Sequence, residues 1–306
     1  MPILKTYSAK DIEVLEGLAP VRKRPGMYIG GTDENAYHHL ANEILDNSID
    51  EAVAGYSKEI NVKLISQNTI QISDDGRGIP IDKHPKKNKT ALEVVMTTLH
   101  SGGKFNDGVY KSSAGLHGVG LSVVNALSSK LNIQVTKNYK IHTQDYSRGK
   151  PLNKLKQKGK AKVKNGTQIT FSPDPEIFGK DTVFKAEKIY ELTKNKAYLQ
   201  KGIKITWECN NSLVGRNSKI TTKETFLFSK GIEDFLKNEI NQKNVIHDKV
   251  CFQSGNLDDK KGKLEFALQF NRDKIKFNKA FCNTVYNMSG GTHDAGFRSG
   301  IAKSIR

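Results

Sequence analysis

One amphipathic segment with a line of polar side chains constrains the fold of this chain more than any other feature. Between residues 38 and 52 the apolar side chains recur every three or four positions, which predicts an α-helix over about residues 36–54. Side chains four residues apart lie on one face of a helix. His39, Glu43 and Asn47 therefore form a line beside the apolar stripe. Such a line needs partners, because an unpaired buried polar group costs about 1–3 kcal/mol.

Two interpretations of this polar line are open at this point. In the functional interpretation, Glu43 is a general base, His39 orients it, and Asn47 offers an oxygen ligand to a hard cation. In the structural interpretation, the segment is an amphipathic helix with an acidic solvent face. Asp46, Asp50 and Glu51 fit the structural interpretation. The choice depends on what the rest of the chain contains.

Size and composition describe a folded protein of about two domains. The chain has 306 residues, of which 36% are hydrophobic and 26% charged, and this length can bury a sizeable core. It contains no apolar run long enough to span a membrane and no signal-peptide pattern, so we expect no membrane partner. Three widely spaced cysteines argue against a disulfide framework or a zinc cluster and favour the reducing cytoplasm.

The net charge of +17 is the one extreme value in the composition. A strongly basic chain fits a polyanionic partner such as DNA, because neutralising phosphates releases counterions. Lysine, asparagine and isoleucine are all abundant, however, as AT-rich coding would also produce. The charge is therefore only weak support for a DNA partner.

A strand that ends in a glycine-containing turn supplies a second polar element. Residues 59–65 and 69–73 alternate polar and apolar side chains, which predicts two strands. The second strand runs into residues 74–80 (DDGRGIP), whose two glycines let the backbone approach a ligand closely. Asp74 at the strand end can accept a hydrogen bond from an exocyclic amine such as that of adenine. An Asp-Gly turn with proline is also common in loops, so this motif alone decides nothing.

A glycine-rich loop that opens a helix supplies the third element. Residues 115–120 (GLHGVG) precede a helical run over 121–127, and such a loop offers backbone N–H groups and the positive end of the helix dipole to a phosphate. Its order differs from the dinucleotide fingerprint, and it does not end as a Walker loop does. Before it, residues 83–114 are predicted to be mostly a lid-like loop with a short helix at 91–99. The three elements in this order together indicate a nucleotide site.

The remaining pattern predicts a second, smaller unit after residue 222. Before that point strands are predicted at 131–136, 141–146, 166–171 and 203–208, helices at 12–18 and 184–199, and a basic solvated loop at 150–164. After it come a helix at 233–240, strands at 249–253, 263–271 and 281–286, and a helix from about residue 295. The chain stops within that helical pattern without a cap, which predicts a fragment of a longer protein.

In this order the elements resemble the ATPase subunit of bacterial type IIA DNA topoisomerases, which is the B subunit of topoisomerase IV or of gyrase. The resemblance covers essentially the whole chain. The stretches that carry it most specifically are VRKRPGMYIG (21–30), DDGRGIP (74–80), LHSGGKF (99–105), GLHGVGLSVVNAL (115–127) and GGTHDAGF (290–297). Histidine kinases, Hsp90 and MutL share the nucleotide-binding fold but lack the first and the last of these stretches.

The resemblance implies an α+β fold in two domains. Residues 1–222 would form a GHKL (Bergerat) ATPase domain, which is an α/β sandwich on a mixed sheet. Residues 223–306 would form the N-terminal part of an α/β transducer domain similar to ribosomal protein S5 domain 2, truncated here. The implied function is ATP-driven closure of a dimer gate around DNA, for strand passage, relaxation, decatenation and chromosome segregation. The implied partners are double-stranded DNA, the DNA-cleaving A subunit and a second copy of the chain, in the cytoplasm.

The resemblance also assigns roles to residues, with ATP and Mg²⁺ as ligands. It implies that Glu43 activates water for attack on the γ-phosphate, that His39 orients Glu43, and that Asn47 coordinates Mg²⁺. Ala114 stands where a glycine is common. The family's further γ-phosphate lysine would lie beyond residue 306, so we expect this chain to bind ATP better than it hydrolyses it. The implied nucleotide contacts are Tyr7 from an arm that reaches a second subunit, Asn47, Asp74 at the adenine amine, Gly76, Arg77, Gly78, Ile79, Pro80, Lys104 in the lid, Ala114, Gly115, Leu116, His117, Gly118, Val119, Gly120, and Thr167 beside Asp74.

Several alternatives stay open. Residues 282–285 (CNTV) and 146–149 (YSRG) resemble topoisomerase IV more than gyrase, which introduces negative supercoils. A chaperone or mismatch-repair ATPase of the same superfamily is disfavoured by the stretches at 21–30 and 290–297. The last alternative is a non-catalytic basic module that binds DNA by charge and holds ATP only as a structural ligand.

Overall fold

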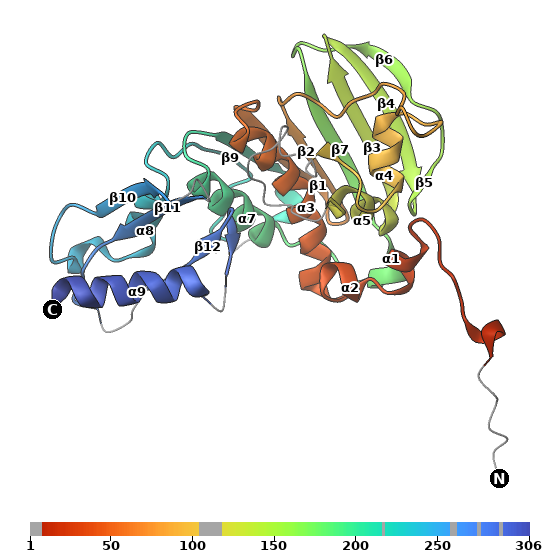
Figure 1. Ribbon diagram of the computed structural model, residues 1–306. Coiled ribbons are helices and arrows are strands. Elements are labelled where there is room, and N and C mark those ends of the chain that lie inside the picture. The colour runs from red at the N-terminus through yellow and green to blue at the C-terminus, as the bar shows by residue number, and fades with distance from the viewer. Residues whose placement is uncertain (1–7, 104–117, 216–217, 258–261, 274–276, 288–289) are drawn as a thin grey trace.

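A large mixed sheet organises the first part of the chain (Figure 1). The computed structural model describes residues 8–103, 118–215, 218–257, 262–273, 277–287 and 290–306. Within them a 9-stranded sheet has the order β5-β4-β3-β7-β2-β1-β8-β9, with β6 paired to β4. Only the β1–β8 pair is parallel. The strands are β1 Glu59–Ser66, β2 Thr69–Asp74, β3 Ser128–Lys137, β4 Lys140–Ser147, β5 Lys150–Pro151, β6 Lys156–Lys160, β7 Gly166–Pro173, β8 Lys204–Cys209 and β9 Lys223–Phe226.

A layer of helices packs against the large sheet. Helices α3, α5 and α7 contact strands of the sheet, and α3 contacts both α5 and α7. The members of the hydrophobic core lie between residues 18 and 226, so the interior is formed by this sheet and these helices. The helices are α1 Ala19–Lys23, α2 Gly26–Ile29, α3 Glu34–Val53, α4 Ala91–Thr97, α5 Gly120–Ala126, α6 Pro175–Phe178 and α7 Ala186–Leu199.

Helix α3 confirms the helix predicted over residues 36–54. The Asp33 carboxylate caps its N-terminus by accepting a hydrogen bond from the Ala36 N–H at 2.9 Å, as N-cap side chains do. One turn in, the buried His38 ring contacts the Glu34 carbonyl at 2.7 Å and accepts a hydrogen bond from the Lys185 N–H at 2.9 Å. Burial lowers the pKa of His38. This histidine therefore fastens α3 to the start of α7 and is structural.

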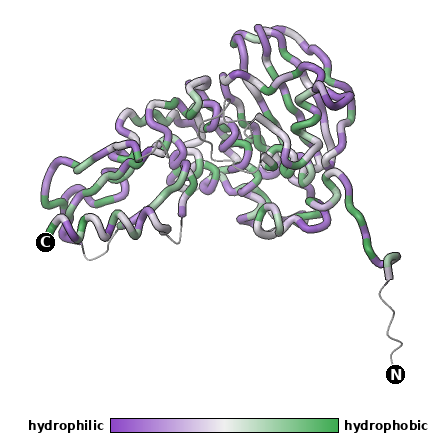
Figure 2. Tube along the Cα trace, in the orientation of Figure 1, coloured by the Kyte–Doolittle hydropathy of each residue, from purple (hydrophilic) through white to green (hydrophobic). Residues whose placement is uncertain are grey.

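Two predictions about the first part are wrong. The helix predicted at 12–18 is absent: a 3-10 turn at Ala9–Asp11 comes before it and α1 begins at Ala19. Ile12 and Val14 are exposed, so the periodic apolar pattern there has no surface to pack on. The loop predicted at 150–164 contains β5 and β6. These strands lie at the edge of the sheet, and Figure 2 shows that end as strongly hydrophilic. Lysines suit an exposed edge, where backbone pairing needs no apolar face.

The second part of the chain contains smaller sheets and two helices. Strand β9 pairs with β8 and so still belongs to the large sheet, although it lies beyond residue 222. Figure 1 shows strands β3, β4 and β7 of the large sheet on one side of the molecule, α8 and α9 on the other, and α3 and α7 between them. No described helix is long and apolar enough to cross a membrane. The later elements are α8 Ile232–Glu239, β10 Cys251–Asn256, β11 Lys263–Leu268, β12 Phe281–Cys282, β13 Val285–Tyr286 and α9 Thr292–Ile305.

The single strand predicted at 281–286 is instead a short hairpin. Strands β12 and β13 pair antiparallel around Asn283 and Thr284, whose φ angles are 46° and 69°. Two consecutive positive φ values are typical of the two-residue turns that fit the twist of a hairpin. Asparagine is common at the first position of such a turn, but a β-branched threonine at the second position, where glycine is usual, obscures the signal. The hairpin was therefore missed, because residues 281–286 resemble one continuous strand interrupted only by this pair.

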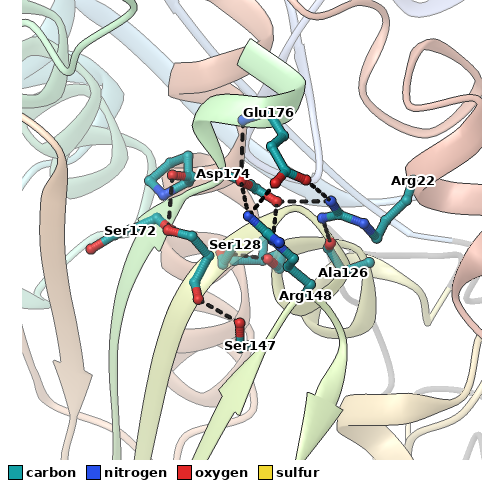
Figure 3. A network of polar contacts seen from close by, with 11 residues as sticks. Arg22, Ala126, Ser128, Ser147, Arg148, Ser172, Asp174 and Glu176 are labelled. Carbon is teal, nitrogen blue, oxygen red and sulfur yellow. Dashed lines mark hydrogen bonds and ion pairs between the residues drawn. The ribbon is translucent and has the colours of Figure 1, made fainter. Parts of the chain in front are cut away.

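A network of ion pairs ties α1 to the end of α5 (Figure 3). The Arg22 guanidinium donates to the Ala126 carbonyl and lies 2.8 Å from the buried Asp174 carboxylate. Arg148 contacts the same carboxylate at 2.8 Å. Burial alone would raise the pKa of Asp174, but the Glu176 N–H and the two guanidinium groups hold it below its ordinary value. The network explains the placement of arginine in the stretch 21–30.

We expect Arg22→Met to lower the free energy of unfolding by about 1.5–3 kcal/mol, because a charge-assisted hydrogen bond and an ion pair to a buried carboxylate are lost. Urea unfolding followed by circular dichroism measures the change. Arg24→Met is the matched control, since Arg24 is exposed and makes no ion pair with a described residue. Equal stability of the two variants would contradict the structural role of Arg22.

Candidate functional site

A cavity of about 530 Å³ lies where the three predicted polar elements meet. Helix α3 contributes one wall, the end of β2 and the following turn another, and the start of α5 a third. Gly76 does not line the cavity but donates its N–H to Asp74. The structure thus brings together every described residue predicted for the site. Those lining the cavity are His39, Glu43, Asn47, Asp74, Arg77, Gly78, Ile79, Pro80, Gly118, Val119, Gly120 and Thr167.

Six residues implied by the resemblance lie outside the described residues. They belong to the expected N-terminal arm, the lid and the first part of the glycine loop, and their roles stay predictions. They are Tyr7, Lys104, Ala114, Gly115, Leu116 and His117.

The polar line along α3 forms a connected set of contacts. His39 Nε2 lies 3.2 Å from Glu43 Oε1, and this hydrogen bond raises the pKa of His39, although burial opposes it. The Asn47 amide N–H donates to the Glu43 carbonyl at 2.7 Å, so the amide oxygen is the atom of that side chain that can coordinate a cation. An imidazole that holds a carboxylate in place is the arrangement expected for an oriented general base.

The described residues fit a Mg²⁺ ion only together with a phosphate ligand. They contain no group of three or more His, Cys, Asp or Glu side chains that could hold a metal ion. Mg²⁺ keeps several waters and is commonly bound by one or two protein oxygens plus substrate phosphates. Asn47 beside a phosphate-binding loop fits that requirement.

Two glycines at the cavity lie so close to other atoms that an added Cβ would contact them. A Cβ added at Gly120 would overlap Glu43 Oε2, and the Glu43 Cδ would lie at 3.2 Å. The carboxylate of α3 and the first residue of α5 are therefore in direct contact distance. Gly78 has φ of 72°, and a Cβ there would meet the carbonyl oxygens of Gly166 and Thr136 at 3.0 and 3.1 Å. Gly78 therefore requires glycine, whereas a side chain at position 120 would displace the Glu43 carboxylate.

Asp74 is an ionisable group with a strongly altered environment. The Ser48 hydroxyl donates to Asp74 Oδ2 at 2.9 Å, and the Gly76 N–H donates to Oδ1 at 3.0 Å. Thr167 is its partner on the neighbouring strand β7. Burial raises the pKa of Asp74 to about 7, against the effect of these hydrogen bonds. A carboxyl group that titrates near neutrality at a cavity wall is a candidate for ligand recognition.

Nucleotide affinity should therefore depend on pH through Asp74. An ionised carboxylate is a stronger acceptor for the hydrogen of an exocyclic amine than a protonated carboxyl group, so affinity falls as the pH drops through about 7. We expect the Kd for ADP to rise up to about tenfold per pH unit below the pKa. Without ligand the effect on folding is opposite: because the folded state holds this proton more tightly, stability falls as the pH rises from about 4 to about 7.

Calorimetric titration between about pH 8 and about pH 6 measures this dependence. Tripolyphosphate, which has phosphates but no adenine, is the control ligand, because it shares the protonation of the phosphates. Asp74→Asn should bind ADP weakly and with little dependence on pH beyond that of tripolyphosphate. A constant ratio of the two Kd values across the range would exclude Asp74 as the amine acceptor.

Several residues that line or support the site were missed, among them Glu51, Ser48 and Lys137 at the cavity and Tyr56 against Arg77. The Arg77 guanidinium lies 2.8 Å from Glu51 and 3.8 Å from the centre of the Tyr56 ring. Lys137 on β3 donates to the carbonyls of Arg77 and Gly78 at 2.7 and 2.8 Å, and burial lowers its pKa. Glu51 had a signal, because it continues the four-residue spacing of the polar line on α3. For Ser48, Tyr56 and Lys137, no local sequence pattern indicates a place in the site.

The acidic solvent face expected in the structural interpretation of α3 is wrong. Asp46 and Asp50 are 6% and 0% exposed. Asp46 lies 2.6 Å from the Lys196 ammonium and accepts a hydrogen bond from the Asn42 amide at 2.8 Å. The acidic residues of α3 therefore face neighbouring elements, and the helix is covered on more than its apolar stripe.

Comparison with known proteins agrees with the geometry. A family model described as histidine kinase-, DNA gyrase B-, and HSP90-like ATPase matches residues 32–177, and one described as DNA gyrase B matches 231–306. The crystal structure of the 43K ATPase domain of Thermus thermophilus gyrase B, in complex with an aminocoumarin, superimposes with a TM-score of 0.77 at 36% identity. That match covers 92% of this chain and 70% of the other. The fold and the cavity thus define a GHKL ATPase with the start of a transducer domain.

Sequence relatives narrow the class. The chain is 50% identical to the DNA topoisomerase 4 B subunit of Rickettsia bellii, over 99% of this chain and 46% of the relative. It is 41% identical to the DNA gyrase B subunit of Streptococcus pyogenes, over 99% of this chain and 45% of the relative. The chain belongs to the family of type IIA DNA topoisomerase B subunits. It spans about half the length of the curated relatives it matches.

Proposed function

We propose that this chain binds and hydrolyses ATP as the N-terminal region of the B subunit of a topoisomerase IV. The observation that supports it most is the convergence of the Glu43 carboxylate and the Gly118–Gly120 backbone on one cavity. A general base next to a phosphate-binding loop is what phosphoanhydride hydrolysis requires. The half-buried carboxylate of Asp74 in the same cavity supplies a means of recognising adenine.

The roles of the residues follow from their contacts. Glu43, held by His39, takes the proton of the attacking water. The Asn47 amide oxygen holds Mg²⁺, which when bound neutralises phosphate charge. Asp74 accepts from the adenine amine with Thr167 beside it. The proposed nucleotide contacts are those predicted above: Gly76, Arg77, Gly78, Ile79, Pro80, Gly118, Val119 and Gly120, and, outside the described residues, Tyr7, Lys104, Ala114, Gly115, Leu116 and His117.

The domain division and the partners are proposed together. We place the ATPase domain at residues 1–222 and the transducer domain at 223–306, with β9 as the strand that joins them. ATP binding would pair two copies of the chain and so close a gate on double-stranded DNA, in the cytoplasm. The DNA-cleaving A subunit would complete the enzyme. These proposals rest on the family, because the chain is about half as long as its relatives.

Topoisomerase IV is preferred to gyrase on sequence similarity. The identity to a topoisomerase 4 B subunit is 50%, and to a gyrase B subunit 41%, over the same share of this chain. The full-length protein assembled with its A subunit should relax and decatenate DNA in the presence of ATP. Negative supercoiling of relaxed plasmid in the same assay would assign it to gyrase instead.

A co-crystal of the chain with Mg²⁺ and a non-hydrolysable ATP analogue tests the site as a whole. We expect the triphosphate between Glu43 and Gly120, the metal on Asn47 and the adenine amine on Asp74. A nucleotide bound elsewhere, or a Glu43 carboxylate turned away from the phosphates, would overturn the proposal. Calorimetry on the same protein gives the affinity.

A further inference from the structure

A buried lysine joins the nucleotide cavity to the second part of the chain. Lys196 on α7 is 4% exposed. Its ammonium lies 2.6 Å from Asp46 Oδ1 and donates to the Thr284 carbonyl at 3.0 Å. Asp46 lines the cavity next to Asn47, and Thr284 lies in the β12–β13 turn. Neither adenine recognition nor hydrolysis, as proposed above, uses this lysine.

The two contacts of Lys196 are of different kinds. A lysine ammonium has three hydrogens to donate, so it can serve a carboxylate and a carbonyl together. Asp46 is a charged partner inside the protein, where an ion pair is screened little by solvent. Thr284 offers only a backbone carbonyl, from a different unit of the fold. The lysine is therefore held mainly by α3, and through it the hairpin is attached to α3.

The turn that carries Thr284 has an uncommon backbone conformation. Asn283 and Thr284 have φ of 46° and 69°, and a positive φ is uncommon for a β-branched residue such as threonine. Sites where such a conformation persists are held by surrounding contacts. The hydrogen bond from Lys196 to the Thr284 carbonyl is one contact that holds this turn.

We propose that Lys196 is a positioning residue that couples ligand occupancy of the nucleotide cavity to the β12–β13 hairpin. The inference rests on the proposed function, because it takes the ligand to be a nucleotide with Mg²⁺. A divalent cation on Asn47 adds positive charge near the carboxylate of Asp46 and competes with Lys196 for it. When Asp46 holds the ammonium less firmly, the Thr284 carbonyl becomes its principal acceptor, and the hairpin is held more tightly to α7.

Hydrogen–deuterium exchange of the amides in residues 279–287 tests the coupling. The protein is measured with and without saturating Mg²⁺ and ATP analogue, after calorimetry has established the Kd for each variant. In the native chain we expect ligand to slow exchange in this segment about threefold or more. Lys196→Met should bind the ligand yet lose that response. Lys194→Met is the matched control on the same helix, where the lysine is half-buried, and it should respond as the native chain does.

Each outcome has a definite meaning. If the native chain binds no nucleotide, the proposed function fails. If it binds nucleotide but shows no slowing at the hairpin, or if Lys196→Met keeps the full response, the coupling is overturned while the proposed function stands. If Lys196→Met does not fold, the double variant Asp46→Asn/Lys196→Met replaces it, because it leaves no buried carboxylate without its cation. Loss of the response in that variant, with nucleotide still bound, supports the coupling, and a full response excludes it.

Discussion

Glu43→Gln should slow ATP hydrolysis about 10²–10⁴-fold, which is the usual contribution of a positioned general base. Glutamine keeps the shape of the side chain but cannot take a proton from water. The His39 ring, which lies 3.2 Å from the carboxylate, still has an oxygen to contact. Affinity for the ATP analogue should therefore stay within about threefold of the native value. Steady-state phosphate release by the full-length protein, with its A subunit and DNA, measures the rate.

A second acidic residue of α3 provides the control for this experiment. Glu34 lies on the first turn, and its carboxylate is paired on the surface with Lys185 and Lys188 at 2.6 Å. Glu34→Gln should leave hydrolysis unchanged. If Glu43→Gln also hydrolyses ATP at the native rate, Glu43 is not the general base, and the proposed role of the His39–Glu43 pair is wrong.

Gly120→Ala should weaken nucleotide binding, with a loss in affinity of up to about 100-fold, corresponding to a few kcal/mol. The added methyl group would occupy the place of Glu43 Oε2. Either the carboxylate turns away or the start of α5 moves, and each change opens the distance between the base and the phosphate loop. Titration calorimetry with the ATP analogue measures the loss, and thermal unfolding shows whether the variant is folded.

Gly159→Ala is the matched control, because Gly159 has no atom within 4 Å of an added Cβ. It lies on the edge strand β6, far from the cavity in the sheet order. This variant should bind nucleotide as the native chain does. Native affinity in Gly120→Ala would mean that the phosphates do not pass between Glu43 and α5, and the proposed binding mode would be wrong.

Local patterns predicted the elements of the site but not what covers them. The four-residue spacing of His39, Glu43 and Asn47 predicted that their side chains lie on one face of α3. It also contained Glu51, which was instead counted toward the acidic solvent face of the structural interpretation. Asp46 and Asp50 were counted toward the same face, and both are buried. Periodicity gives the angle of a side chain around the helix axis, whereas burial depends on which distant segment packs there.

Contacts between distant residues could not be predicted from spacing. Lys137 reaches the turn after β2 only because β3 and β2 both pair with β7. Lys196 and Asp46 are far apart in the sequence, and so are Arg22 and Asp174. Basic residues are abundant in this chain, so nothing in the sequence distinguished Lys137, Lys196 or Arg22 from a surface residue. The edge strands β5 and β6 were missed for a related reason, because their side chains are solvated.

The hydrogen bond from Arg22 to the Ala126 carbonyl limits how far this chain can be trimmed from its start. Ala126 is the last residue of α5, and Gly120 at the other end of that helix lies against Glu43. A deletion that ends before α1 keeps this hydrogen bond. One that removes Arg22 frees the far end of a seven-residue helix whose near end borders the proposed phosphate site. Shortened versions made for inhibitor screening should therefore retain α1.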